Sequence, residues 1–116
     1  MAEAFDPAGF AQRQLEAYNA RDLERFVHEY TDDVEVYRLP STEPVSRGKA
    51  AFADHYRKNR FNLANLHAEV VNRMVIGNKV IDHERVTGVQ DKPMEVAAIY
   101  EVTPRGIAKV WFLSGE

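Results

Sequence analysis

Apolar residues in the first part of the chain recur with the period of a helix. Asp6 and Pro7 predict a helix start, with Asp6 as the cap and Pro7 in the first helical position. The apolar positions of this first helix are Ala11, Leu15 and Tyr18. After a break at residues 19–21, Asp22 is expected to cap a second helix that ends at residues 31–33. The apolar stripe of that helix is Leu23, Phe26, Val27 and Tyr30.

A short strand is predicted next, around Val34 and Val36. The following segment, residues 39–47, holds two prolines and is expected to be an irregular loop. A third helix is predicted to begin at Ser46 or Gly48 and to end near residue 59. Its expected inward-facing side chains are Phe52, His55, Tyr56 and Asn59.

After residue 64 the apolar pattern changes to a period of two, which is typical of strands. The predicted strands are Leu66–Ile76, Lys79–Thr87, Met94–Val102 and Ile107–Ser114. Turn residues at 77–78, 91–93 and 104–106 join them by short connections, so neighbouring strands should run antiparallel. The sequence therefore predicts one α+β domain over residues 1–116, with the helices packed on one face of a sheet.

Composition narrows the functions that this domain could have. The chain has 116 residues, 45% of them hydrophobic, and a net charge of -3 without a basic cluster, which argues against nucleic-acid binding. It has no cysteine, so thiol catalysis and cysteine–zinc sites are excluded. His28, His67 and His83 lack metal-ligand spacing, and we expect no metal and no cofactor. Without a predicted signal peptide or membrane segment, a cytoplasmic location is expected.

The stretch Val80–Gly88 (VIDHERVTG) carries the most unusual chemistry in the sequence. Successive side chains of a strand point to opposite faces, so Asp82 and Glu84 share one face with the flanking valines. The other face is cationic and fits the outside of the sheet, opposite Glu95 and Glu101. We therefore expect both carboxylates to point inward. An exposed strand of alternating charges is the alternative, and a bulge between the two carboxylates would also reverse part of the pattern.

The neighbouring strands offer matching inner faces. In the first long strand the expected inner set is Ala68, Val70, Met74 and Ile76, against an outer set of His67, Glu69, Val71 and Arg73. In the third, the expected inner set is Val96, Ala98, Tyr100 and Val102. Trp111 is expected on the outer face with Ile99 and Leu113, as an apolar patch suited to a dimer contact. A tryptophan pointing into a pocket is the alternative.

Two inward carboxylates would make an acid–base site. Residues two apart on one strand face place their carboxyl groups about 6–7 Å apart. Burial and like charge should then raise one of the two pKa values, so that one group acts as a base and the other as an acid. The expected partners of the pair are Gln14, Arg38, His55, Tyr56 and Tyr100.

Several segments together resemble a known superfamily. They are YNARDLERFVHEYTDDVEV, the helix SRGKAAFADHYR and the terminal VWF. With the two helices, the proline-rich loop and the long meander, they look like the NTF2-like superfamily, and most like its SnoaL-like and ketosteroid-isomerase-like members. The resemblance implies a cone of three N-terminal helices on a curved, mostly antiparallel sheet. It also implies a deep apolar pocket for a hydrophobic small molecule and a homodimer formed through the outer sheet face.

The resemblance does not extend to the catalytic residues of ketosteroid isomerase. The position of that enzyme's base corresponds to Tyr37 or Arg38, and its two oxyanion donors correspond to Gln14 and Ala98. Two supporting tyrosines match, at Tyr30 and Tyr56. Ketosteroid isomerase activity itself is therefore not expected. The arginine and two aspartates of the superfamily's epoxide hydrolases are matched only loosely, within residues 82–85.

Two functional hypotheses follow. The first is a cofactor-independent enzyme that performs proton transfer, cyclisation or water addition on a hydrophobic carbonyl or epoxide compound. Its expected catalytic residues are Asp82, Glu84, His55 and Tyr56. Its expected substrate-binding residues are Gln14, Tyr18, Tyr30, Arg38, Phe52, Ala98, Tyr100 and Phe112. The second is a non-catalytic dimeric module that binds an apolar ligand or a protein, in which the tyrosines are simply core aromatics and Arg38 a surface residue.

Overall fold

Helices and strands follow one another along the chain in the computed structural model, which describes residues 5–115. In order they are α1 (Pro7–Asn19), α2 (Leu23–His28), β1 (Tyr30–Arg38), β2 (Pro44–Arg47), α3 (Lys49–Asn59), β3 (His67–Ile76), β4 (Lys79–Thr87), β5 (Met94–Thr103) and β6 (Gly106–Ser114). No helix within residues 5–115 is long and apolar enough to cross a membrane.

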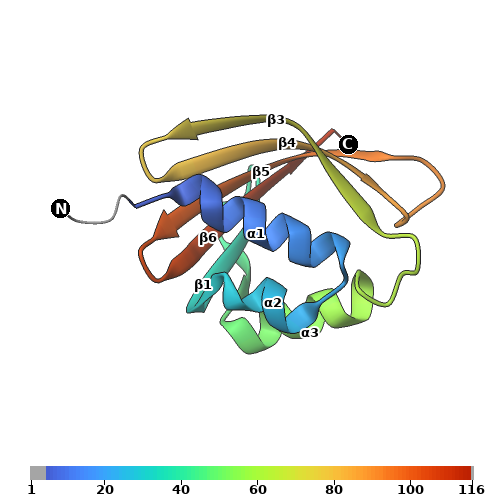
Figure 1. The fold of residues 1–116 in the computed structure, drawn as a ribbon, viewed down its shortest axis with the longest axis horizontal. Helices are drawn as coiled ribbons and strands as arrows, with labels where there is room; N and C mark the ends of the chain where they lie inside the picture. Colours follow the sequence, from blue (N-terminus) through green and yellow to red (C-terminus); the bar gives the residue numbers. More distant parts are fainter. Residues whose placement is uncertain (1–4, 116) are drawn as a thin grey trace.

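The six strands form one sheet in the order β2-β1-β6-β5-β4-β3. Every neighbouring pair is antiparallel except β1 and β6, which run parallel. Figure 1 shows the three helices on one side of the sheet, with α1 lying across it and α2 and α3 beyond. The expected α+β architecture of three helices on a mostly antiparallel sheet is thus confirmed.

Aromatic side chains from the helices fill the space beneath the sheet. Phe26 of α2 and Phe52 of α3 are both buried, and their rings stack with centroids 5.6 Å apart. They pack against Val34 and Ile107 of the sheet in the main hydrophobic cluster. This cluster fixes α2 and α3 against β1, so the helices hold one wall of the space under the sheet.

Local signals placed several boundaries correctly. Pro7 is the first residue of α1, and the Asp22 side chain accepts a hydrogen bond from the Arg25 amide at 3.2 Å, as a helix cap does. Strand β4 spans Lys79–Thr87 as predicted. Its outer face carries the cationic set, with His83 at 2.5 Å from Glu95 across the strand pair.

The predicted end of the second helix was wrong. Helix α2 ends at His28, and Tyr30 is the first residue of β1 rather than the last of the helical stripe. Residues 31–33, expected to terminate the helix, also belong to β1. Tyr30 is still buried, because it pairs with Ile107 of β6 and its ring faces the helices. Pairing with a strand distant in sequence overrode the local helical spacing.

The predicted loop at residues 39–47 was also wrong in part, because Pro44–Arg47 forms β2. This strand lies at the edge of the sheet and pairs with β1 alone. A proline is tolerated as the first residue of an edge strand, where its missing N–H leaves no ladder bond unmade. The proline signal therefore excluded a central strand but not an edge strand.

The second half of β3 faces the opposite way from the prediction. The pairing with β4 runs from Val70 opposite Glu84 to Asn72 opposite His83, so Val71 is an extra residue in a bulge. A one-residue bulge reverses the faces of all residues beyond it. Met74 and Ile76, expected in the core, are 47% and 59% exposed. Arg73, expected outside, points inward instead.

Candidate functional site

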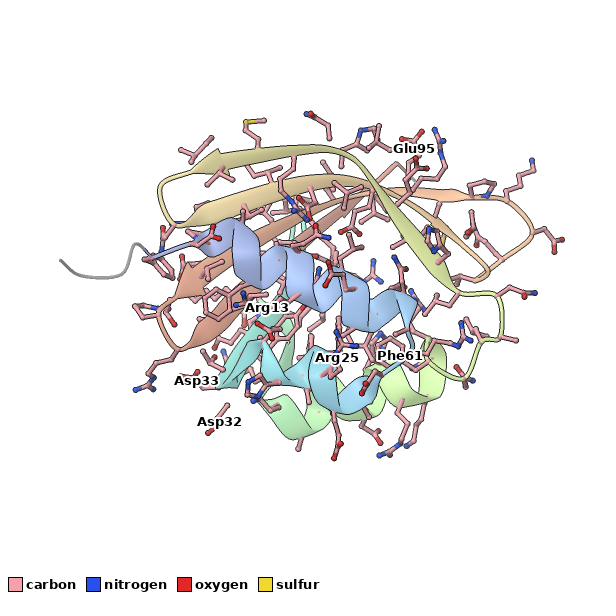
Figure 2. All side chains as sticks on the ribbon, viewed as in Figure 1. Arg13, Arg25, Asp32, Asp33, Phe61 and Glu95 are labelled. Carbon is pink, nitrogen blue, oxygen red and sulfur yellow. The ribbon has the colours of Figure 1, made fainter. Side chains whose placement is uncertain are left out.

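A cavity of about 920 Å³ lies between the inner face of the sheet and the helices. This volume is at the upper end of the range for small-molecule pockets. Ten of the twelve predicted site residues line it: Gln14, Tyr18, Tyr30, Arg38, Phe52, His55, Tyr56, Glu84, Tyr100 and Phe112. Asp82 and Ala98 do not. Figure 2 shows how side chains from both the helices and the strands fill this side of the sheet.

Glu84 is the acidic group at the buried end of the cavity. It projects from the middle of β4 and is 7% exposed. Burial away from water raises the pKa of Glu84 to about 7, and the negative charge of Asp82 adds to this effect. A hydrogen bond from Tyr100 and the charge of Arg73 act in the opposite direction. The expectation that one carboxyl pKa rises is met, and the group is poised to exchange a proton near neutral pH.

Asp82 does not share the cavity, contrary to the sequence prediction. Its side chain is fully buried beside β3, where Arg73 donates to both carboxylate oxygens at 2.7 and 3.0 Å. Ala98 lies opposite Asp82 on β5 and is equally buried. The bidentate arginine keeps the carboxylate hydrogen-bonded without water. Asp82 is therefore a fixed charge behind the cavity wall rather than a group that a ligand can touch.

A chain of hydrogen bonds connects α1 to Glu84. The Tyr30 hydroxyl donates to Gln14 Oε1 at 2.9 Å, and Gln14 Nε2 donates to the Tyr100 hydroxyl at 3.2 Å. The Tyr100 hydroxyl in turn donates to Glu84 Oε2 at 3.3 Å. Gln14 Nε2 also donates to the Ala11 carbonyl, so its amide is fully engaged. Gln14 therefore orients its neighbours, and Tyr100 fixes one oxygen of Glu84.

Tyr18 and Tyr56 also line the cavity, but they do not belong to the hydrogen-bond chain that includes Tyr30 and Tyr100. Their rings meet edge to face with centroids 6.3 Å apart, and both line the cavity. Burial raises the pKa of Tyr18 to about 12 and raises that of Tyr56 further, and the charge of Glu84 contributes to both shifts. Both hydroxyls therefore stay protonated at neutral pH, close enough to Glu84 to feel its charge.

The exposed end of the cavity carries positive charge. Arg38 ends β1, Arg60 follows α3, and both line the cavity together with His55. His55 was expected to face inward. It is exposed at this end, and burial of part of its ring, with Arg60 and Arg38 nearby, lowers its pKa. Its Nδ1 lies 3.2 Å from the side-chain nitrogen of Asn59.

Several polar residues of this region were missed at the level of sequence, among them Gln90, Glu95 and Ser114 of the cavity lining. Arg73 was assigned to the outer face, Arg60 follows a helix end, and Ser46 was placed at a helix start. Arg60 and Ser46 line the cavity, while Arg73 binds Asp82. Only Arg60 had a signal in the sequence, because it belongs to the basic run at the end of the predicted third helix.

The opposite, outer face of the sheet carries Trp111, as expected. The ring of Trp111 stacks on Tyr37 with centroids 5.5 Å apart and pairs in register with Ile99. The alternative of a tryptophan inside the cavity is not supported, because Trp111 is absent from the lining.

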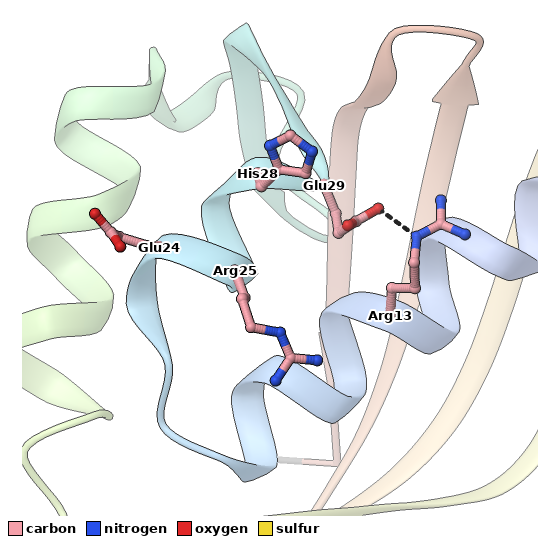
Figure 3. Close-up of a pocket in the computed structure, with 5 residues that line it drawn as sticks. All are labelled: Arg13, Glu24, Arg25, His28 and Glu29. Atoms are coloured by element: carbon pink, nitrogen blue, oxygen red, sulfur yellow. Dashed lines mark hydrogen bonds and ion pairs between the residues drawn. The ribbon is translucent and has the colours of Figure 1, made fainter.

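A second, smaller hollow of about 370 Å³ lies between α1 and α2 (Figure 3). Arg13 donates to Glu29 across it at 2.9 Å. The other lining residues, Glu24, Arg25 and His28, add both signs of charge, so the hollow offers no uniform potential to a ligand. Within residues 5–115, no three histidine or acidic residues are grouped as a metal site would need.

Comparison with known proteins identifies the family of this chain. The model of the family described as "SnoaL-like domain" matches residues 11–110. No curated protein matches the chain.

Several solved structures share the fold. A cystatin-fold protein from Novosphingobium aromaticivorans, described as uncharacterised, is 24% identical with a TM-score of 0.83 over 94% of this chain and 98% of its own. An NTF2-like protein of unknown function from Cytophaga hutchinsonii is 10% identical with a TM-score of 0.80, over 98% and 94%. A candidate ketosteroid isomerase from Kribbella flavida is 16% identical with a TM-score of 0.81, over 95% and 78%. At these identities the likeness establishes the fold alone. The chain belongs to the SnoaL-like domain family and has the NTF2-like fold.

Proposed function

We propose that this protein is a cofactor-independent enzyme that moves a proton on a hydrophobic carbonyl compound, with Glu84 as the acid–base group. The observation that carries the proposal is the position of Glu84: a carboxyl group with a pKa of about 7, facing a large cavity. A base with a pKa near the working pH combines the correct ionisation state with useful basicity. Strongly shifted acidic groups in cavities are enriched at catalytic sites.

The surrounding hydroxyl groups complete the proposed chemistry. When ionised Glu84 removes a proton from the carbon next to a carbonyl, negative charge develops on the carbonyl oxygen. The protonated hydroxyls of Tyr18 and Tyr56 would donate hydrogen bonds to that oxygen. Glu84 then returns the proton to the same or a neighbouring carbon, which gives exchange or isomerisation. Tyr100 and Gln14 hold the carboxyl group and are positioning residues.

Epoxide opening by water is the less favoured reaction of the same class. It needs one group to activate water and a second to protonate the leaving oxygen. Asp82, the expected second carboxyl group, lies behind the cavity wall in a bidentate pair with Arg73. Glu95 also lines the cavity but is exposed and paired with His83, so a single buried carboxyl group, Glu84, suits proton shuttling better than a two-carboxyl hydrolysis.

Deuterium uptake in D₂O tests the proposal. The α-protons of 2-tetralone, a hydrophobic ketone, are followed by NMR with the uncatalysed exchange subtracted. We expect exchange by the wild-type protein to fall at least about 100-fold in Glu84→Gln, the usual loss on removing a general base. The exposed Glu69→Gln is the matched control and should leave exchange unchanged. Equal exchange by wild type and Glu84→Gln would refute the role of Glu84.

A binding module without turnover is the second candidate function. The engaged Gln14–Tyr100–Glu84 chain would serve equally to build a fixed polar wall for a ligand. In that case 2-tetralone binds with no exchange above background, and Glu84→Gln changes only its affinity. A cytoplasmic location, expected from the sequence, stays a prediction for either function.

We also propose that a second copy of the chain covers the outer face of the sheet. One apolar row crosses five strands in register, at Met74, Ile81, Ile99, Trp111 and Tyr37. Beside it runs a row of alternating charges, at Lys79, Glu101, Lys109 and Glu35. An apolar centre beside a charged border is typical of protein interfaces.

Light scattering after size-exclusion chromatography tests this pairing. The wild-type protein should run as a dimer, and Ile99→Lys, at the centre of the row, should run as a monomer with the same circular dichroism. Ala50→Lys, exposed on α3, is the control and should stay dimeric. A wild-type protein that is monomeric at about 100 µM would exclude this interface, because stable protein dimers form well below that concentration.

A further inference from the structure

Two arginines at the exposed end of the cavity lack a compensating charge. Arg38 ends β1 and Arg60 follows α3, and both line the cavity. Their shared effect on the pKa of His55 places them at the same end. Neither forms an ion pair with a carboxylate within residues 5–115. The guanidinium of Arg60 donates to the carbonyl of Asn59 and also lies within hydrogen-bonding reach of the Tyr18 hydroxyl, and its remaining N–H groups can serve a ligand.

A hydroxyl without a partner in the described part of the chain belongs to a residue of the same cavity lining. Ser46 lines the cavity from β2, and its Oγ is buried with no hydrogen-bond partner in the described part of the chain. It is paired in register with Val36 of β1. Val36 and Arg38 are two residues apart on one strand and both line the cavity, so Ser46 and Arg38 belong to adjoining parts of one wall. A buried hydroxyl without a partner is costly, and rotation of the Ser46 side chain toward the cavity would let a ligand oxygen satisfy it.

The acidic residues of the cavity do not neutralise this end. Glu84 lies at the buried end and is hydrogen-bonded to Tyr100. Glu95 is at the rim and is paired with His83 at 2.5 Å. An anion supplied by a ligand is therefore the natural partner for the two guanidinium groups.

Apolar side chains make up much of the rest of the cavity lining. Phe52 and Phe112 line the cavity from α3 and β6, and Val86 and Met94 line it from β4 and β5. Contact with these side chains favours a ligand with an apolar body. The cavity thus combines two arginines without a paired carboxylate, apolar walls and one buried acid–base group.

We infer that the ligand is an apolar organic acid, whose carboxylate binds Arg38, Arg60 and the hydroxyl of Ser46 while its apolar body extends toward Glu84. A carboxylate matches the fork of guanidinium donors and can also accept a hydrogen bond from a hydroxyl. This inference names the substrate class of the site proposed above, and it rests on that site being the functional one.

Calorimetric titration with two naphthalene probes tests the inference. The probes are 2-naphthoate and the neutral ketone 2-acetonaphthone, which share one ring system. At low salt and near pH 8, the wild-type protein should bind the acid about five- to tenfold more tightly, the effect expected of partly solvated charge-assisted hydrogen bonds. That preference should shrink as salt is raised, because screening weakens exposed charges.

Single substitutions then assign the preference to residues. Arg38→Gln and Arg60→Gln should each weaken binding of 2-naphthoate about threefold or more while changing the affinity for 2-acetonaphthone less than twofold. Ser46→Ala should also weaken binding of 2-naphthoate more than binding of 2-acetonaphthone. Arg57→Gln is the matched control, because Arg57 is exposed on α3, pairs with Asp54 and does not line the cavity. It should change neither affinity.

Three results would overturn the inference. The first is equal or tighter binding of the neutral ketone, and the second is an equal loss of affinity for both probes in the arginine variants. The third is that neither probe binds at about 1 mM, because a weaker affinity would not support a binding site. These titrations need no turnover. A selective loss in the arginine variants together with unchanged deuterium exchange in Glu84→Gln would remove the proposed reaction and keep the acid-binding site. Deuterium exchange that depends on Glu84, without preferential binding of the acid, would keep the proposed reaction and remove the acid-binding site.

Discussion

Replacing Glu84 with glutamine should change how the stability of the protein depends on pH. In the folded protein the pKa of Glu84 is raised from 4.5 to about 7, chiefly by burial. Between these two values the folded protein keeps the proton that the unfolded chain releases. The free energy of unfolding therefore falls as pH rises through this range. The contribution of Glu84 is complete below pH 4.5 and is lost as pH passes through about 7.

The size of the effect follows from the same two numbers. The difference between 4.5 and about 7, at about 1.4 kcal/mol per pH unit, gives a loss of about 3 kcal/mol. Glutamine has no proton to release, so Glu84→Gln lacks this loss. Its stability relative to wild type should therefore rise by about 3 kcal/mol between pH 4.5 and pH 8. Any constant penalty for burying the amide shifts the whole curve and leaves its slope unchanged.

Urea unfolding at a series of pH values measures this difference. The single tryptophan, Trp111, reports unfolding by fluorescence, and circular dichroism provides a second signal. All other titrating groups are common to the two proteins and cancel in the comparison. Glu69→Gln, an exposed residue on β3, is the control and should run parallel to wild type. Parallel curves for wild type and Glu84→Gln would refute a carboxyl group that titrates near neutral pH.

Three further substitutions test the surroundings of this group. Tyr100→Phe removes the hydrogen bond that lowers the pKa of Glu84, so the midpoint of the Glu84 titration, followed by carbon NMR, should move upward. Asp82→Asn removes the neighbouring negative charge, so the same midpoint should move downward; an unchanged midpoint would mean that burial alone sets it. Gly88→Ala should lower the free energy of unfolding by at least about 2 kcal/mol in a urea titration, because Gly88 has a φ of +87° and an added Cβ would lie 2.1 Å from the Asn65 carbonyl oxygen. Wild-type stability in that variant would show that the turn can rearrange.

Local patterns determined much of this molecule. The alternation in Lys79–Thr87 correctly predicted the limits of β4 and the inward direction of both carboxylates, because every side chain of a regular strand obeys the same period of two. The proline and aspartate signals at Pro7 and Asp22 correctly placed two helix starts, since a cap depends on the residues next to it. The superfamily resemblance predicted the fold because its motifs are local sequence patterns that occur along most of the chain.

Contacts between distant segments decided the rest. Tyr30 has helical spacing, yet pairing with Ile107 makes it the first residue of a strand. The bulge at Val71 depends on how two strands fit together, and no feature of the sequence marks it. That bulge turns Arg73 inward and ties up Asp82, which leaves Glu84 as the acidic group at the buried end of the cavity. The sequence alone determined which residues could form an acid–base site. Only the tertiary structure decided which carboxyl group meets the cavity, because one extra residue in a strand reverses every side chain after it.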